Sequence, residues 1–154
     1  MRGPLLRRSR PTAAASVAPM AVDASLVGRT FPPTPPYAVT GERIAEFAAA
    51  TGSVYDGGPA PATFPIVVAF AAMTALMEDP SVGIELHRVV HGEQRFSYTR
   101  PVVAGDRLSA TLTVDTLRRL GGADVIGTRS EIVDEQGSPV CTAYATLVHT
   151  GEAS

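Results

Sequence analysis

Residues 57–77 contain no charged side chain, and the second half of this segment, IVVAFAAMTALM at 66–77, is apolar at every position except Thr74. A helix that is apolar on every side has to be covered on every side, because apolar surface is stabilised by leaving water. The run spans only about 20 Å as a helix, which is too short for a comfortable membrane crossing. We therefore predict a helix over 66–77 that is enclosed by the rest of the chain.

A shorter amphipathic helix is predicted over residues 41–51, with Thr40 as its N-cap. The connection to the longer helix contains PAPATFP at 59–65, which supplies turn residues. In this connection Thr63 is the predicted cap of the longer helix, and Pro65 is tolerated in a first helical turn.

Four later stretches alternate between apolar and polar residues, at 89–100, 108–115, 125–133 and 140–148. This period of two is typical of strands with one buried face. A shorter strand is predicted at 37–39, and DEQG at 134–137 suits a hairpin turn. An antiparallel meander that curls around a buried helix is an α+β hotdog fold. Because an exposed sheet edge invites pairing, we expect two such subunits to associate side by side.

The charges divide the chain into two parts. Residues 1–22 carry four of the thirteen basic residues and no acidic one, whereas all fifteen acidic residues follow. No continuous apolar stretch in this segment suits a signal peptide, so we predict a disordered tail over 1–22 and one folded domain over 23–150. Translation from Met20 instead of Met1 is an alternative. The acidic body disfavours binding to nucleic acid.

The single cysteine, Cys141, excludes an internal disulfide and a zinc site built from thiolates. It lies within a predicted strand, where we expect a small buried side chain and no nucleophile. The three histidines, His87, His91 and His149, are too scattered in the sequence to indicate a metal site. We predict a cytoplasmic protein without a metal or a cofactor.

Three ordered motifs carry a resemblance to a known family: VGRTFPPTPPYAVTGERIAEFAAATG, then PAPATFP, then HGEQRFSYTRPVVAGDRL. Together they resemble the MaoC-like dehydratase N-terminal domain family of actinobacteria, a FAS1-type dehydratase group that includes HadA-like hotdog subunits. The resemblance runs over residues 22–149. It implies the reversible dehydration of a (3R)-hydroxyacyl thioester, carried by coenzyme A or an acyl carrier protein. It also implies that backbone N–H groups near the start of the central helix hold the thioester oxygen.

Active members of that family place a D-x-N-P-x-H stretch just after the first helix, and its Asp and His perform the acid–base chemistry. In this chain Ser53 falls where the aspartate belongs and Gly58 where the histidine belongs. Asp56 is a weak candidate for the carboxylate, but no histidine occurs before His87. We therefore predict that the catalytic pair is absent.

His91 is the other weak catalytic candidate. Regular alternation places it on the same strand face as Glu93 and Arg95, opposite Val90, Phe96 and Tyr98. The residues predicted to contact the acyl substrate lie at the start of the central helix and in the HGEQ segment: Thr63, Phe64, Val67, Phe70, His91 and Gly92.

The first hypothesis is a non-catalytic or weakly catalytic acyl-binding subunit that works with a second hotdog chain bearing the Asp–His pair, in a heterodimer. Alternatives are a stand-alone dehydratase or thioesterase, as a homodimer, with a rebuilt site that uses Asp56 or Glu93 as base, and a catalytically dead acyl-binding or scaffold protein. We expect the chain to bind neither nucleic acid nor a membrane. The acyl chain length and the carrier stay open.

Overall fold

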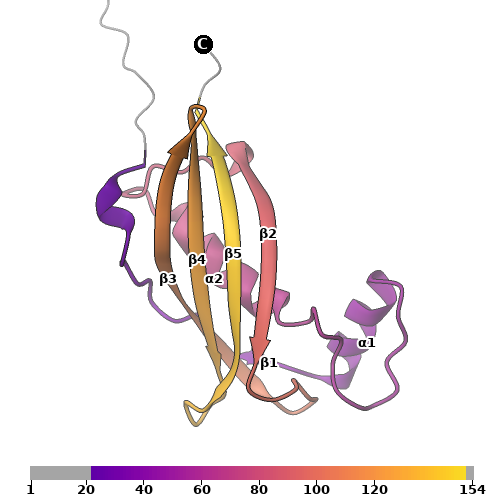
Figure 1. Ribbon diagram of the computed structural model, residues 1–154. Helices are drawn as coiled ribbons and strands as arrows, with labels where there is room; N and C mark the ends of the chain where they lie inside the picture. Colours follow the sequence, from indigo (N-terminus) through magenta and orange to yellow (C-terminus); the bar gives the residue numbers. More distant parts are fainter. Residues whose placement is uncertain (1–21, 152–154) are drawn as a thin grey trace, which may run out of the picture.

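The computed structural model describes residues 22–151 (Figure 1). The predicted tail lies outside them, apart from Val22, which is buried against the domain. The elements in chain order are η1 (Ala24–Leu26), β1 (Tyr37–Ala38), α1 (Gly41–Ala50), α2 (Ile66–Glu78), η2 (Leu86–Arg88), β2 (Val89–Tyr98), β3 (Arg107–Leu120), β4 (Ala123–Val133) and β5 (Pro139–Thr150). No helix within 22–151 is both long and apolar enough to span a membrane.

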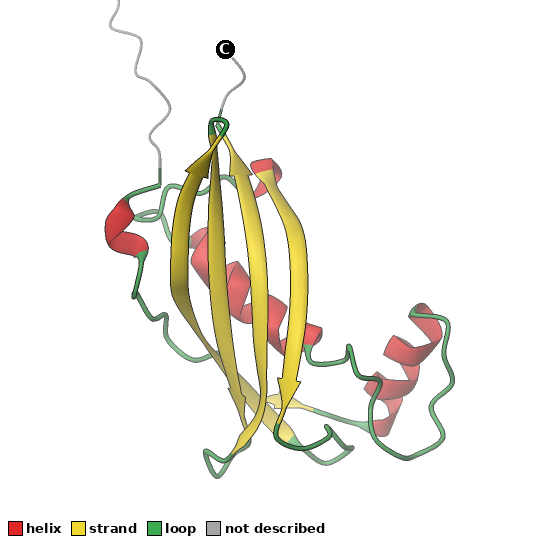
Figure 2. Ribbon diagram, viewed as in Figure 1, coloured by secondary structure: helices red, strands yellow, loops and turns green. Residues whose placement is uncertain are grey.

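The five strands form one antiparallel sheet in the order β1-β3-β4-β5-β2. Figure 2 shows the sheet curling across the front of α2, with α1 set to one side. This arrangement is the predicted hotdog fold. The hairpin between β4 and β5 turns where DEQG predicts it, because the Asp134 carboxylate accepts the N–H groups of Gln136 and Ser138 and Gly137 has a φ of 79°.

The chain before β1 runs along the outer edge of β3. Phe31 N–H donates to the Leu112 carbonyl at 2.9 Å, and Thr34 N–H donates to the Ala110 carbonyl at 2.9 Å. This segment therefore covers one edge of the sheet, where unpaired backbone groups would otherwise face water. At the opposite edge β2 pairs with β5, and no described strand lies on its other side.

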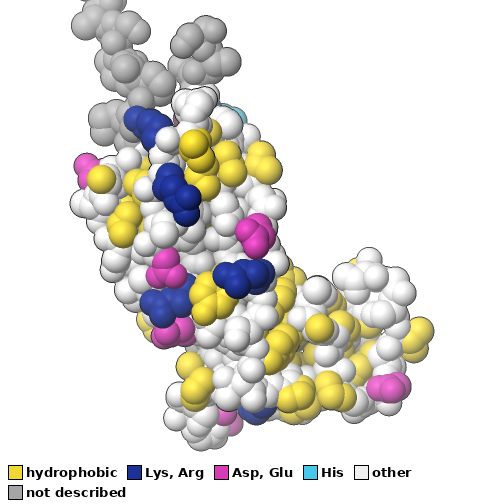
Figure 3. Space-filling view, viewed as in Figure 1, with side chains coloured by type: hydrophobic (Ala, Val, Ile, Leu, Met, Phe, Trp, Pro, Cys, Tyr) yellow, Lys and Arg dark blue, Asp and Glu magenta, His cyan; other side chains and the backbone are white. Residues whose placement is uncertain are grey.

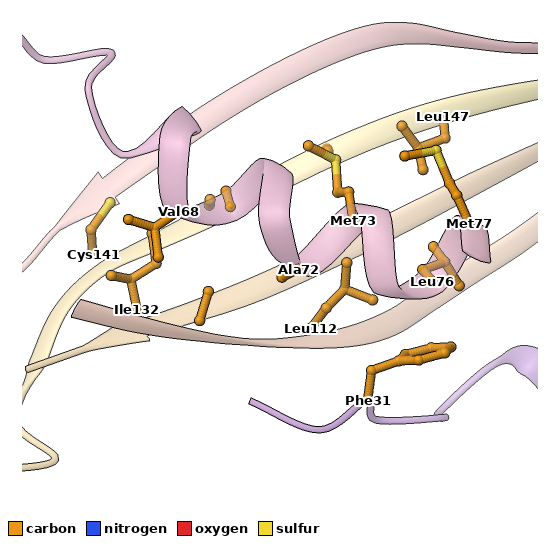
Figure 4. Close-up of a cluster of buried hydrophobic side chains, with 14 of the residues drawn as sticks. Phe31, Val68, Ala72, Met73, Leu76, Met77, Leu112, Ile132, Cys141 and Leu147 are labelled. Atoms are coloured by element: carbon orange, nitrogen blue, oxygen red, sulfur yellow. The ribbon is translucent and has the colours of Figure 1, made fainter. Parts of the chain in front are cut away.

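Helix α2 packs its buried residues against the concave face of the sheet. Figure 4 shows Val68, Met73 and Leu76 directed toward side chains of the strands. This face of the helix lies in the interior because it has no polar side chain for water to solvate. The predicted bounds of both helices are confirmed to within one residue, and the Thr40 hydroxyl caps α1 by accepting Arg43 N–H.

One face of α2 is open, which corrects the prediction of a helix enclosed on every side. Phe70 is 51% exposed, and Ala71 and Ala75 are exposed as well. The sheet curves over one side of the helix only, and within the described chain nothing covers the other. Thr63 also does not cap α2 with its side chain, because Pro65 is the N-cap and Thr63 contributes only its carbonyl, to Ile66 N–H.

A β-bulge in β2 overturns the predicted assignment of side chains to its two faces. His91 lies opposite Leu147 of β5, whereas Glu93 lies opposite Thr146, so the register shifts by one residue at Gly92. Side chains on directly opposed residues share a face. His91 therefore shares the concave face with Phe96, while Val90 lies on the convex face with Glu93 and Arg95.

The R-P-x-x-x-G-D motif at residues 100–106 joins two turns of the chain. The Arg100 guanidinium bonds both oxygens of Asp106, at 2.9 and 3.1 Å, and also reaches Asp134 at 3.5 Å. These carboxylates raise the pKa of Arg100 further above its usual value. The motif thus ties the turn before β3 to the β4–β5 hairpin.

The convex face of the sheet is polar. Figure 3 views this face and shows basic and acidic side chains side by side over the strands. Among them, Arg95 lies over the ring of Tyr144, and Arg129 is 3.5 Å from Asp115. Such exposed pairs contribute little to stability, so the main effect of these charged side chains is to make this face of the sheet compatible with water.

Candidate functional site

The start of α2 is held in place by Tyr98 of β2. Its hydroxyl donates to the Ala62 carbonyl at 2.5 Å, across 36 residues of sequence. Burial raises the pKa of Tyr98 to about 12, with the nearby Cys141 as a second cause, so the hydroxyl stays a donor at neutral pH. The other end of the same peptide unit is the Thr63 N–H, which makes no hydrogen bond within residues 22–151. This N–H is available to a ligand.

The residues predicted to line an acyl site divide into two groups. Val67 and Phe70 lie on the open face of α2, with Thr63 exposed just before it. Phe64 instead points inward: it is fully buried and packs edge-on against the rings of Tyr37 and Phe47. Phe64 is therefore a core residue that anchors the turn before α2.

The segment where the family places its catalytic pair forms a loop without an imidazole. The Ser53 hydroxyl bonds the Ala48 carbonyl at the end of α1. The Asp56 carboxylate accepts the Gly58 N–H at 3.0 Å and is exposed. Both polar side chains are thus engaged in local turns, and the loop contains no histidine to pair with Asp56.

His91 and Gly92 lie at the free edge of the sheet. The His91 side chain is exposed on the concave face, and its Nε2 lies 3.1 Å from the Gln94 side-chain oxygen. Gly92 occupies the bulge itself. No hydrogen bond or ion pair within residues 22–151 joins His91 to Asp56.

One histidine and one aspartate that were not predicted as a pair from the sequence lie side by side. Asp124 of β4 and His149 of β5 are direct cross-strand partners, only 5% and 6% exposed, with Asp124 Oδ2 3.8 Å from His149 Nδ1. Arg119 holds the other carboxylate oxygen at 2.9 Å. Counting outward from the turn at 134–137 would pair Asp124 with Leu147, and the irregular pairing beside that turn places His149 opposite Asp124 instead, so the sequence pattern did not show this pair. They lie near the C-terminal end of α2, away from the start of the helix.

The geometry of His149 does not suit acid–base catalysis. Its Nε2 accepts the Glu85 backbone N–H at 3.3 Å, so the proton of the neutral ring is on Nδ1. A base needs a free lone pair, and here the only lone pair on the ring is engaged. As placed, Asp124 and His149 therefore do not form an acid–base pair.

Cys141 is buried in β5, as the sequence predicted. Burial raises the pKa of its thiol to about 11. The thiolate that nucleophilic chemistry requires is therefore scarce at neutral pH.

The curled sheet and apolar helix define a protein of the hotdog class, with its open surface at the start of the helix and along the free edge strand. The chain belongs to the FAS1-like dehydratase domain region family, whose model matches residues 25–143. It is 45% identical over 143 residues to a UPF0336 protein of Streptomyces coelicolor, covering 84% of this chain and 95% of the relative. A UPF0336 protein of Leifsonia xyli is 46% identical over 145 residues, covering 85% and 97%.

Solved structures agree with this assignment. A chain of the C-terminally truncated HadBC (3R-hydroxyacyl-ACP dehydratase) complex of Mycobacterium tuberculosis has a TM-score of 0.69 and 29% identity, over 80% of this chain and 96% of that one. A MaoC-like dehydratase has the same TM-score and identity, but the match covers 82% of this chain and 43% of that chain. The unliganded R-hydratase PhaJ1 of Pseudomonas aeruginosa, 20% identical with a TM-score of 0.53, shares the fold over 82% of this chain and 83% of its own.

Proposed function

We propose that this chain is the acyl-thioester-binding, non-catalytic subunit of a (3R)-hydroxyacyl-thioester dehydratase, and that a second hotdog chain supplies the Asp–His pair. The observation that carries the proposal is the loop at residues 53–58, which belongs to a dehydratase-family fold but contains no histidine. The likeness to a chain of HadBC, which is described as a complex, supports a partnership of this kind.

The partner's place is the open surface beside β2. The free edge of β2 has unpaired backbone groups, and the adjacent open face of α2 presents Val67, Phe70 and Ala71. Apolar side chains next to a free strand edge are stabilised by a second subunit that continues the sheet and covers them. The acyl chain then lies against α2, between the two subunits.

Within this arrangement the chain's contribution is binding. The Thr63 N–H lies at the start of α2, where the helix dipole favours negative charge, and is placed to hold the thioester carbonyl oxygen. Tyr98 fixes the orientation of that peptide by its hydrogen bond to the Ala62 carbonyl. The partner's carboxylate and imidazole would then move the protons at C2 and at the hydroxyl.

The test is to purify the chain alone and together with a hotdog chain that carries D-x-N-P-x-H, and to follow hydration of crotonyl-CoA. We expect activity only from the pair, and none when the partner's Asp and His are replaced. A gene for such a partner beside the gene for this chain would support the choice. If the lone chain hydrates the thioester as fast as the pair does, the proposed division of labour is wrong.

A further inference from the structure

The edge strand β2 carries two opposite charges that are two residues apart. Glu93 and Arg95 both lie on the convex face, and their side chains are 63% and 68% exposed. Figure 1 shows β2 at the edge of the sheet, beyond β5. The two charged groups are 3.7 Å apart, and an ion pair this exposed contributes little to the stability of the lone chain. Both charges are therefore available to a strand that pairs with this edge.

A strand that adds to this edge needs a matching pattern of charges. Directly opposed residues of an antiparallel pair share a face, with their β-carbon atoms about 5 Å apart. Unlike charges in that relation stabilise the pairing, and like charges destabilise it. A suitable neighbour therefore places a basic residue opposite Glu93 and an acidic residue opposite Arg95.

A second copy of β2 meets this requirement in one register. Two identical antiparallel strands are related by a two-fold axis. The axis lies between two copies of the same residue, since any other placement would oppose side chains from different faces. With the axis at Gln94, Glu93 of each copy is opposite Arg95 of the other, which makes two ion pairs.

The neighbouring registers do not make these pairs. An axis at Glu93 or at Arg95 places that residue opposite its own copy, so like charges meet. An axis at Phe96 places Ser97 opposite Arg95, and no ion pair forms. On the other side, the bulge at Gly92 interrupts the regular alternation. The register centred on Gln94 is thus the one in which the charges of this edge complement each other.

We propose that β2 binds a second copy of this chain, antiparallel and with Gln94 at the centre, and that Glu93 and Arg95 select both the partner and the register. The proposal concerns the chain by itself and does not rest on the proposed dehydratase role. The two share one surface, however. A subunit that carries the Asp–His pair has to displace the second copy, and it needs the same pattern of charges on its own edge strand.

Charge reversals test the proposal on the full-length chain, with the dissociation constant of the dimer measured by sedimentation equilibrium. Glu93→Arg and Arg95→Glu each bring like charges together at two symmetric positions. We expect each variant to dissociate at least about tenfold more readily than the unchanged chain, because two attractive pairs become repulsive. Arg118→Glu is the matched control, because it makes the same change of charge on exposed β3, which is not adjacent to β2.

Mixing the two single variants separates the interface from effects within one strand. One variant is basic at positions 93 and 95 and the other is acidic at both, so a mixed dimer restores the unlike pairs between chains while neither chain restores its own. We expect the equimolar mixture to associate within about threefold of the unchanged chain.

Three results would overturn the proposal. The unchanged chain could stay monomeric up to about 100 μM, which would show that the edge does not bind a second copy. A dimer that tolerates both reversals would use another surface or register. A mixture as dissociated as the single variants would show that the reversals act within one strand. None of these measurements involves the Asp–His subunit, so each result leaves the proposed function to its own test.

Discussion

His91 and Glu93 project from opposite faces of β2, although they are only two residues apart. In a regular strand they would share a face, but the extra residue at Gly92 reverses the alternation. His91 thereby lies on the concave side with Gln94, next to the open surface, and Glu93 lies on the convex side with Arg95. A single bulge thus decides which polar side chain of the HGEQ segment is near the proposed subunit interface.

The position of His91 predicts a small effect of its removal. Because the partner is proposed to supply the acid–base pair, His91→Gln in the assembled complex should lower the rate of crotonyl-CoA hydration by less than about threefold. Loss of a general base typically reduces a rate by about 10² to 10⁴. A reduction of that size, with the complex intact by size-exclusion chromatography, would identify His91 as a catalytic residue.

Two phenylalanines near the start of α2 should respond in opposite ways. Phe64→Ala removes a fully buried ring and should lower the free energy of unfolding by about 3–5 kcal/mol. Phe70→Ser changes a half-exposed residue, so it should leave the stability of the lone chain within about 1 kcal/mol but weaken association with a hotdog partner. Denaturant unfolding and a binding titration measure the two effects. Unchanged association in Phe70→Ser would argue against α2 as the interface.

Gly127 should tolerate a methyl group only if Thr116 is changed as well. The two residues are cross-strand partners on the convex face, and a Cβ at position 127 would overlap the Thr116 hydroxyl. We expect Gly127→Ala to destabilise the protein by about 1–3 kcal/mol, and Gly127→Ala with Thr116→Ala to recover most of that loss. Denaturant unfolding of both single variants and the double variant gives the coupling energy. Additive effects would contradict this contact.

The Tyr98 hydrogen bond should make part of the stability depend on alkaline pH. The pKa of Tyr98 is raised to about 12, above the value near 10 of an unfolded tyrosine, so its contribution is fully present below pH 10 and is lost as the pH rises through 12. At pH 8 we expect Tyr98→Phe to reduce the free energy of unfolding by about 1 kcal/mol. Tyr144→Phe, on the convex face, is the matched control. Equal effects of the two substitutions would show that the hydrogen bond to Ala62 makes no measurable contribution to the free energy of unfolding.

Much of the fold was accessible from local pattern. The uncharged run that became α2, the Thr40 cap of α1, the period of two in the strands and the DEQG turn each specify an element through interactions between near neighbours in the sequence. The absence of a histidine from the loop at 53–58 was equally visible, because it depends only on which residues are present.

The features that were predicted wrongly or were not predicted depend on the packing of distant segments. The bulge at Gly92 is a feature of the pairing between β2 and β5, and no property of HGEQ alone requires it. Phe64 is buried rather than available to substrate because α1 and β1 pack over it, and the open face of α2 exists because the sheet covers only one side of the helix.

The sequence by itself determined that this chain forms a curled sheet with an apolar helix and that the loop at residues 53–58 contains no histidine, since both follow from residue type and short-range spacing. Only the tertiary structure decided that Asp124 and His149 lie side by side and that Tyr98 orients the peptide before α2. These are contacts across 25 and 36 residues, and they are set by strand register and helix placement, which depend on the summed packing of the whole domain.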